Sequence, residues 1–86
     1  MMNEIQLHCE SIREKAQLHA ALAEALSFPD WYGMNLDALY DCLTDLDDPV
    51  HLHLIGWEQL PAWKAAFEAV FNDAENDCME FIVSYE

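Results

Sequence analysis

The sequence predicts a two-layer α/β fold with a three-stranded parallel sheet flanked by helices. Three segments have the pattern of strands: Asn3–Cys9, Val50–Ile55 and Cys78–Tyr85. Segments with apolar residues at helical spacing separate them. This alternation is typical of parallel sheets, because a parallel connection needs a crossover, and right-handed crossovers then predict two layers. A chain of 86 residues can build one hydrophobic core, so we expect a single domain over residues 1–86.

The three expected strands differ in how their faces are patterned. In the first two, apolar residues alternate with polar ones, which predicts one buried and one exposed face. The polar face of the second strand carries His51 and His53. The third strand contains a continuous apolar run, Phe81 to Val83, which predicts burial on both faces.

Capping residues predict where the helices begin. Ser11 followed by Glu14 forms a capping box at the start of the first helix. Asn35 is a favourable N-cap for a second helix that starts at Leu36. Pro61 suits the first position of the third helix. The three helices are expected to end before Pro29, at about Leu46 and at about Glu75.

The composition is strongly acidic, with 17 Asp and Glu against three Lys and Arg and a formal net charge of −14. This charge disfavours nucleic acids and anionic membranes as partners and favours a cationic protein, a metal or simply high solubility. The first residues show no signal-peptide pattern, and no apolar run approaches the roughly 20 residues that span a bilayer. Three widely spaced cysteines predict reduced thiols. We therefore expect a cytoplasmic protein that binds neither nucleic acid nor membrane.

The second expected helix carries an acidic face. Asp37 and Asp41 lie one helical turn apart, and such a like-charge pair costs an isolated helix a few tenths of a kcal/mol. Aromatic and polar side chains accompany them on the same face, beside it and in the preceding loop: Trp31, Tyr32, Tyr40, Thr44 and Asp45. Aromatic residues beside carboxylates are typical of surfaces that bind a basic protein. An ordinary solvated acidic face remains the alternative.

The residues around this helix resemble those of the barstar family. The resemblance rests on Leu18-His19, Leu22, Leu26, Pro29-Asp30-Trp31-Tyr32-Gly33 and Asn35-Leu36-Asp37-Ala38-Leu39-Tyr40-Asp41-Cys42-Leu43-Thr44. The order of the expected elements also matches over the whole chain. The resemblance implies a three-stranded parallel sheet flanked by helices. It further implies tight inhibition of a basic, barnase-like secreted ribonuclease in the cytoplasm of the producing cell.

The same resemblance implies roles for individual residues. Asp41 is expected to enter the phosphate-binding pocket of the ribonuclease and Asp37 to pair with an adjacent Arg, so that carboxylates mimic phosphate. Trp31 corresponds to an aromatic residue that packs against the catalytic His of the enzyme. The other expected contact residues are Tyr32, Gly33, Asn35, Leu36, Tyr40, Thr44, Asp45 and Asp73. Two of these depart from a direct match: Asp45 stands where the best-known member of the family has Gly, and Asp73 aligns across a gap.

Other functions fit the residues less well. The target could be a different basic toxin, with this chain as its immunity protein, or the chain could be an acidic mimic of nucleic acid. His51 and His53 supply only half of a zinc site, without a Cys nearby in sequence, and the acidic residues before them lack the calcium-loop pattern. The paired carboxylates of the second helix lie on one exposed face rather than across a cleft. We therefore expect no metal, no cofactor and no catalytic activity.

Overall fold

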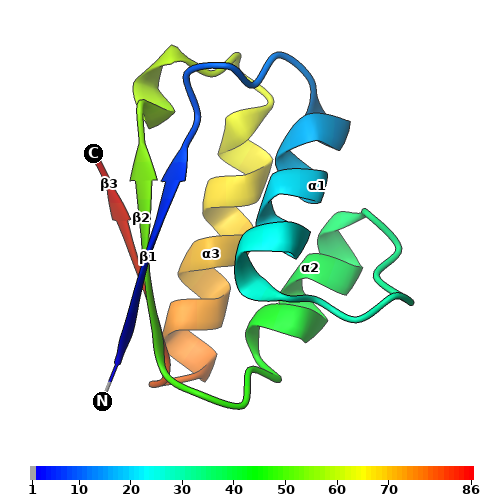
Figure 1. Cartoon of the computed structure of the whole chain (residues 1–86), viewed down its shortest axis with the longest axis vertical. Helices are drawn as coiled ribbons and strands as arrows, with labels where there is room; N and C mark the ends of the chain where they lie inside the picture. Colours follow the sequence, from blue (N-terminus) through cyan, green and yellow to red (C-terminus); the bar gives the residue numbers. More distant parts are fainter. Residues whose placement is uncertain (1) are drawn as a thin grey trace.

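The computed structural model describes residues 2–86 and arranges them in two layers, a sheet and a layer of helices (Figure 1). The strands are β1 (Asn3–His8), β2 (Val50–Ile55) and β3 (Phe81–Tyr85). The helices are α1 (Lys15–Leu26), α2 (Leu36–Leu43), the short 3-10 helix η1 (Trp57–Gln59) and α3 (Lys64–Asp77). No helix of residues 2–86 is both long and apolar enough to cross a membrane.

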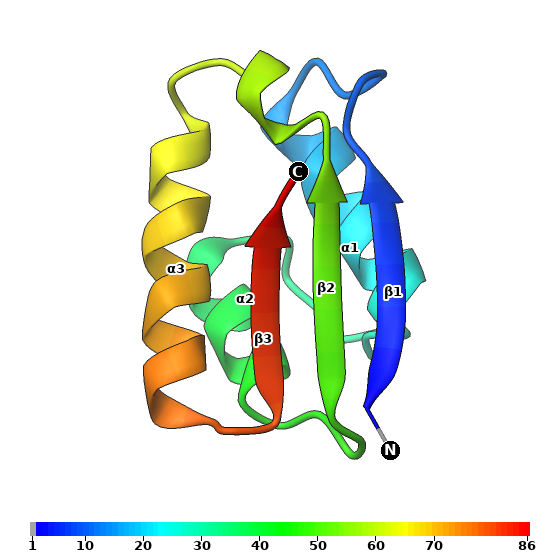
Figure 2. The ribbon, with the colours of Figure 1, turned by 90° about the vertical axis from the view of Figure 1, so that its left-hand side faces the viewer.

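The strands form one parallel sheet in the order β1-β2-β3, which confirms the predicted α/β fold. Leu52 at the centre of β2 pairs with Ile5 of β1 and with Val83 of β3. All three α-helices lie on the same side of the sheet (Figure 1). Figure 2 shows the opposite side, where the three strands face the viewer without a covering helix. We call this uncovered side the open face of the sheet.

The core lies between the sheet and the helices. Val50, Leu52 and Leu54 of β2 are buried on the helix side, and Leu52 and Leu54 are fully inaccessible to solvent. Large side chains from the helical layer meet them: Leu18, Leu22, Leu39, Leu43, Phe67 and Phe71. Trp57 of η1 closes one end of the core, where its indole N–H donates to Glu68 at 2.7 Å.

The open face explains one wrong prediction from the sequence. We expected the run Phe81 to Val83 to be buried on both faces of the sheet. Phe81 is buried against the helices, whereas Ile82 is 39% exposed because its side chain alternates onto the side that no helix covers. A continuous apolar run is typical of a strand covered on both faces, and this sheet is covered on only one.

The helix starts differ in part from those expected. The capping box of α1 is formed by Glu14 and Gln17 rather than by Ser11 and Glu14, and the Gln17 side chain accepts the Glu14 backbone N–H at 3.0 Å. The N-cap Asn35 of α2 is as predicted, but the helix ends at Leu43. Helix α3 begins three residues after Pro61 and extends two residues beyond Glu75.

One polar side chain is buried in the core. His19 of α1 is 5% exposed and is the only buried polar or charged residue in the part of the chain that the structure describes. Its Nδ1 atom lies 2.5 Å from the hydroxyl of Tyr32, and its ring packs 4.8 Å from that of Phe67. Burial lowers the pKa of His19 below its usual value. The imidazole is therefore neutral at pH 7, and its Nδ1 atom shares a hydrogen bond with the Tyr32 hydroxyl.

Truncation of the central strand should destabilise the whole domain. We expect Leu52→Ala to lower the free energy of unfolding by about 2–5 kcal/mol, because it removes buried methyl groups and leaves a cavity. Urea unfolding followed by circular dichroism measures this. Met79→Ala is the control, because Met79 is 94% exposed, and equal losses for the two variants would contradict the assigned core.

Acid should weaken the fold through His19. A His whose folded-state pKa is lowered binds more protons in the unfolded chain, so stability falls as the pH drops through the usual His pKa of about 6.5. The variant His19→Gln has no imidazole to protonate at this position, so its free energy of unfolding does not fall for this reason. We expect the stability advantage of the wild type over His19→Gln to shrink between about pH 7.5 and pH 5.5. Parallel pH profiles of the two unfolding free energies would contradict a neutral, buried His19.

Candidate functional site

The loop before α2 is shaped to start that helix. Asn35 has an extended backbone, and its side-chain oxygen accepts the backbone N–H of Ala38 at 2.8 Å. A Cβ atom at Gly33 would lie 2.9 Å from the amide nitrogen of the same Asn35 side chain. Met34 between them adopts the left-handed conformation, with φ of 53°. Gly33 therefore leaves room for the capping side chain, and the predicted contact residues Gly33 and Asn35 position the helix.

Helix α2 divides its residues between the core and the solvent. Leu39 and Leu43 are fully buried, and the predicted contact residue Leu36 packs against the core while remaining partly exposed. Asp37 and Asp41 are exposed. Neither carboxylate forms an ion pair with a Lys or Arg of residues 2–86. The two predicted charges therefore remain available to an external cation.

Helix α3 adds carboxylates beside α2. The hydroxyl of Tyr40 donates a hydrogen bond to Asp77, and this bond is the main reason that the pKa of Tyr40 is raised. The charges of Asp73 and Asp41 raise it further, so both lie near the phenol. We call Asp37, Asp41, Asp73 and Asp77 the acidic surface. Asp73 of α3, a predicted contact residue, therefore lies near Tyr40 of α2.

Asp77 is a residue of this surface that the sequence analysis missed. It stands four residues after Asp73 on α3, the same spacing that singles out Asp37 and Asp41 on α2. That repeated spacing is the signal that could have identified it. Its contact with Tyr40 joins residues 37 positions apart, which local patterns do not predict.

The two aromatic residues of the loop before α2 differ in how far they are exposed to solvent. Trp31 is 64% exposed. Tyr32 is partly buried, its ring packs at a tilt 4.9 Å from the ring of Phe28, and its hydroxyl shares a hydrogen bond with His19. Burial is the main cause that raises the pKa of Tyr32 to about 12. Tyr32 therefore anchors the loop, and Trp31 presents an indole ring to the solvent.

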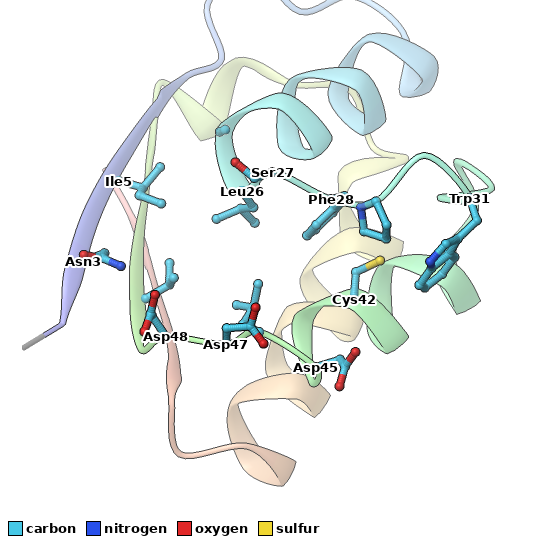
Figure 3. A pocket seen from close by; sticks show the side chains of 14 residues that line it. Asn3, Ile5, Leu26, Ser27, Phe28, Trp31, Cys42, Asp45, Asp47 and Asp48 are labelled. Carbon is cyan, nitrogen blue, oxygen red and sulfur yellow. The ribbon is translucent and has the colours of Figure 1, made fainter.

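Grooves lie on both sides of α2. One, of about 480 Å³, runs between β1 and the loop that carries Trp31, and its rim includes Asp45, Asp47 and Asp48 (Figure 3). The other, of about 460 Å³, is lined by Asn35, Leu36, Asp37 and residues of α1 and α3. Predicted contact residues line both grooves. Thr44 instead donates its hydroxyl to the carbonyl oxygen of Tyr40 at 2.9 Å and stabilises the end of α2.

The chemistry available around α2 is the binding of cations. Its exposed carboxylates can accept charge-assisted hydrogen bonds from Arg or Lys of a partner. Within residues 2–86, the one group of three metal-binding side chains with converging atoms is Glu4, His51 and His53 on the open face, remote from α2. Hydrogen bonds to Glu4 and Glu86 raise the pKa of His53.

Comparison with known proteins identifies the family of this chain. Residues 2–85 match the barstar family, described as barstar (barnase inhibitor). Over 44 residues the chain is 50% identical to a curated protein of Bacillus subtilis (strain 168) named "Putative ribonuclease inhibitor YrdF". The matched stretch covers 51% of this chain and 36% of that protein, so it spans about a third of the relative's length. Because the family match extends over almost the entire sequence, the chain belongs to the barstar family.

Proposed function

We propose that this protein binds and blocks the active site of a basic, barnase-type ribonuclease with the acidic surface of α2 and α3. The observation that carries the proposal is the pair of exposed carboxylates, Asp37 and Asp41, which form no ion pair with a Lys or Arg of residues 2–86. Family membership and the ribonuclease-inhibitor name of the relative support the class of partner.

The physical basis is mimicry of a phosphate group. A ribonuclease holds the phosphate of its RNA substrate with Arg and Lys side chains. A carboxylate placed among those cations accepts charge-assisted, often bidentate hydrogen bonds from Arg. Asp41 fills this role in our proposal, and Asp37, one turn earlier, pairs with a neighbouring Arg. Both side chains project from a helix whose inner face is fixed in the core, so they are held in place before binding.

Aromatic side chains supply the rest of the contact. Trp31 offers a large exposed apolar surface along the groove that Cys42 and Asp45 also line, where burial by a partner gains free energy. Tyr40 lies between the carboxylates of α2 and α3, with its ring oriented by Asp77. We propose that Trp31 packs against the enzyme and that Tyr40 separates the two sets of charges. Asp45 and Asp73 form the periphery.

The net charge of −14 supports fast association. Opposite charges raise the rate of encounter, which matters for an inhibitor of a toxic enzyme. The unpaired thiols of Cys9, Cys42 and Cys78 suit a reducing compartment, so we propose that the inhibitor acts in the cytoplasm. We further propose that the protein has no catalytic activity, because its family and the name of its relative indicate an inhibitor.

Removal of the central carboxylate tests the mechanism. We expect Asp41→Ala to weaken binding to a barnase-type ribonuclease by about 2–5 kcal/mol, because cations of the enzyme remain buried and unpaired in the complex. The fold should keep its stability or gain slightly, since the repulsion with Asp37 disappears. The measurements are a dissociation constant by calorimetry and a urea midpoint. Normal binding by Asp41→Ala would remove the proposed mechanism.

The control is Asp48→Ala. Asp48 is exposed in the turn before β2, outside the proposed contact, and its loss removes the same charge. Equal losses of affinity for Asp41→Ala and Asp48→Ala would mean that diffuse negative charge, rather than a particular carboxylate, binds the enzyme.

Salt should slow the formation of the complex more than it speeds dissociation. Long-range attraction between a protein of charge −14 and a basic enzyme is screened beyond about 8 Å at physiological ionic strength. We expect the association rate to fall as sodium chloride is added, and Asp48→Ala to show a weaker dependence than the wild type. Stopped-flow fluorescence measures both rates. An association rate independent of salt would contradict electrostatic steering.

A further inference from the structure

The open face of the sheet carries a cluster that the proposed inhibitor function does not use. His51 and His53 project from alternate positions of β2, and Glu4 projects from the neighbouring strand β1. The ligand atoms of these three side chains all lie within 4.8 Å of one another. The sequence analysis counted only half of a zinc site here, because Glu4 stands 47 positions before His51 and joins it only through strand pairing.

One oxygen atom is shared by the two histidines. Glu4 Oε1 lies 3.2 Å from His51 Nδ1 and 2.7 Å from His53 Nε2. Two ligands on a tetrahedral zinc ion are about 3.3 Å apart, given metal–ligand bonds of about 2.0–2.1 Å. The distance from Glu4 to His51 already matches that value. A small rotation of the Glu4 carboxylate would lengthen its distance to His53 Nε2 to the same value. This rotation is free to occur because the Glu4 side chain is 58% exposed.

The opposite nitrogen of each histidine has its own partner on the third strand or just beyond it. His51 Nε2 lies 2.7 Å from the hydroxyl oxygen of Ser84, and His53 Nδ1 bonds the carboxylate of Glu86. Metal-binding histidines almost always use the far nitrogen in this way, which fixes the ring and makes the ligating nitrogen more basic. Both rings are therefore oriented so that His51 Nδ1 and His53 Nε2 converge on Glu4.

We propose that Glu4, His51 and His53 bind one divalent transition-metal ion of the zinc class, with Ser84 and Glu86 holding the two imidazole rings. Two histidines and one carboxylate form a ligand set suited to Zn²⁺, with a fourth position open to water, and are poor ligands for Mg²⁺ or Ca²⁺. The ion joins β1 to β2 on the side of the sheet opposite the helices. The metal stabilises the sheet, and the fold does not require it, because the core lies on the other side.

The test is calorimetric titration of the full-length wild type with zinc sulfate in the presence of reductant. We expect binding of one zinc ion per chain and no measurable binding of magnesium. Zinc should also raise the midpoint of thermal unfolding, since a ligand that binds only the folded state stabilises it. Addition of EDTA should return the midpoint to that of the metal-free protein. No ribonuclease takes part in these measurements, so their outcome is independent of the proposed inhibitor function.

Variants identify the ligands. We expect His53→Gln and Glu4→Gln each to abolish the zinc-dependent rise in the thermal midpoint. Glu86→Ala, which removes the carboxylate that holds His53 and leaves the three ligands in place, should weaken zinc binding by about 10- to 100-fold. Glu4 is exposed and supports no part of the core, so Glu4→Gln decides the question even where His53→Gln fails to fold.

Two controls remove other groups that attract zinc. His8 is an exposed histidine of β1 outside the cluster, and Cys78 is a partly exposed thiol. His8→Gln and Cys78→Ser should bind zinc as the wild type does. Absence of zinc binding by the wild type would overturn the proposal. Undiminished binding by Glu4→Gln, or loss of binding in either control, would overturn it as well.

Discussion

Both crossover connections of the sheet pass over the same side, so β2 is buried on one face only. This one-sided burial determines which side chains the two outer surfaces of the molecule present to solvent. Crossovers of one hand in a β1-β2-β3 sheet must place their helices together, so only alternate residues of each strand reach the core. In β2 this gives full burial to Leu52 and Leu54 and a solvent-facing position to His51 and His53. The molecule therefore has two chemically different exteriors, an acidic helical layer and a sheet face with clustered histidines.

The acidic surface is tolerated because α2 does not depend on its outer residues. A helix of eight residues is too short to be stable alone in water, so its stability comes from packing and capping. Leu39 and Leu43 provide the packing, and Asn35 provides the cap. The repulsion between Asp37 and Asp41 costs only a few tenths of a kcal/mol by comparison. The outer face can therefore carry charges arranged for a partner at little cost to the fold.

The sequence predicted the features that local patterns determine. The fold class, the bounds of β2 and the capping role of Asn35 follow from alternation, spacing and residue type, and the structure confirms them. The predicted burial of Ile82 was wrong, because it depends on which side of the sheet the helices cover. The predicted start of α1 was wrong because Gln17, rather than Glu14, supplies the side chain of the capping box. The bond from Tyr40 to Asp77 could not be predicted either, since it joins two helices that only the tertiary fold brings together.

The two exteriors also differ in how charge acts on stability. A net charge of −14 on 86 residues favours encounter with a basic enzyme and opposes compaction through self-repulsion. Neutralising groups near α2 would weaken the field that a partner meets. His51 and His53 lie instead on the open face, where His53 hydrogen-bonds two carboxylates, Glu4 and Glu86, and its pKa is raised by them. Positive charge at this position, from a proton or from a bound metal ion, offsets repulsion within the sheet and leaves the acidic surface of the helical layer unpaired.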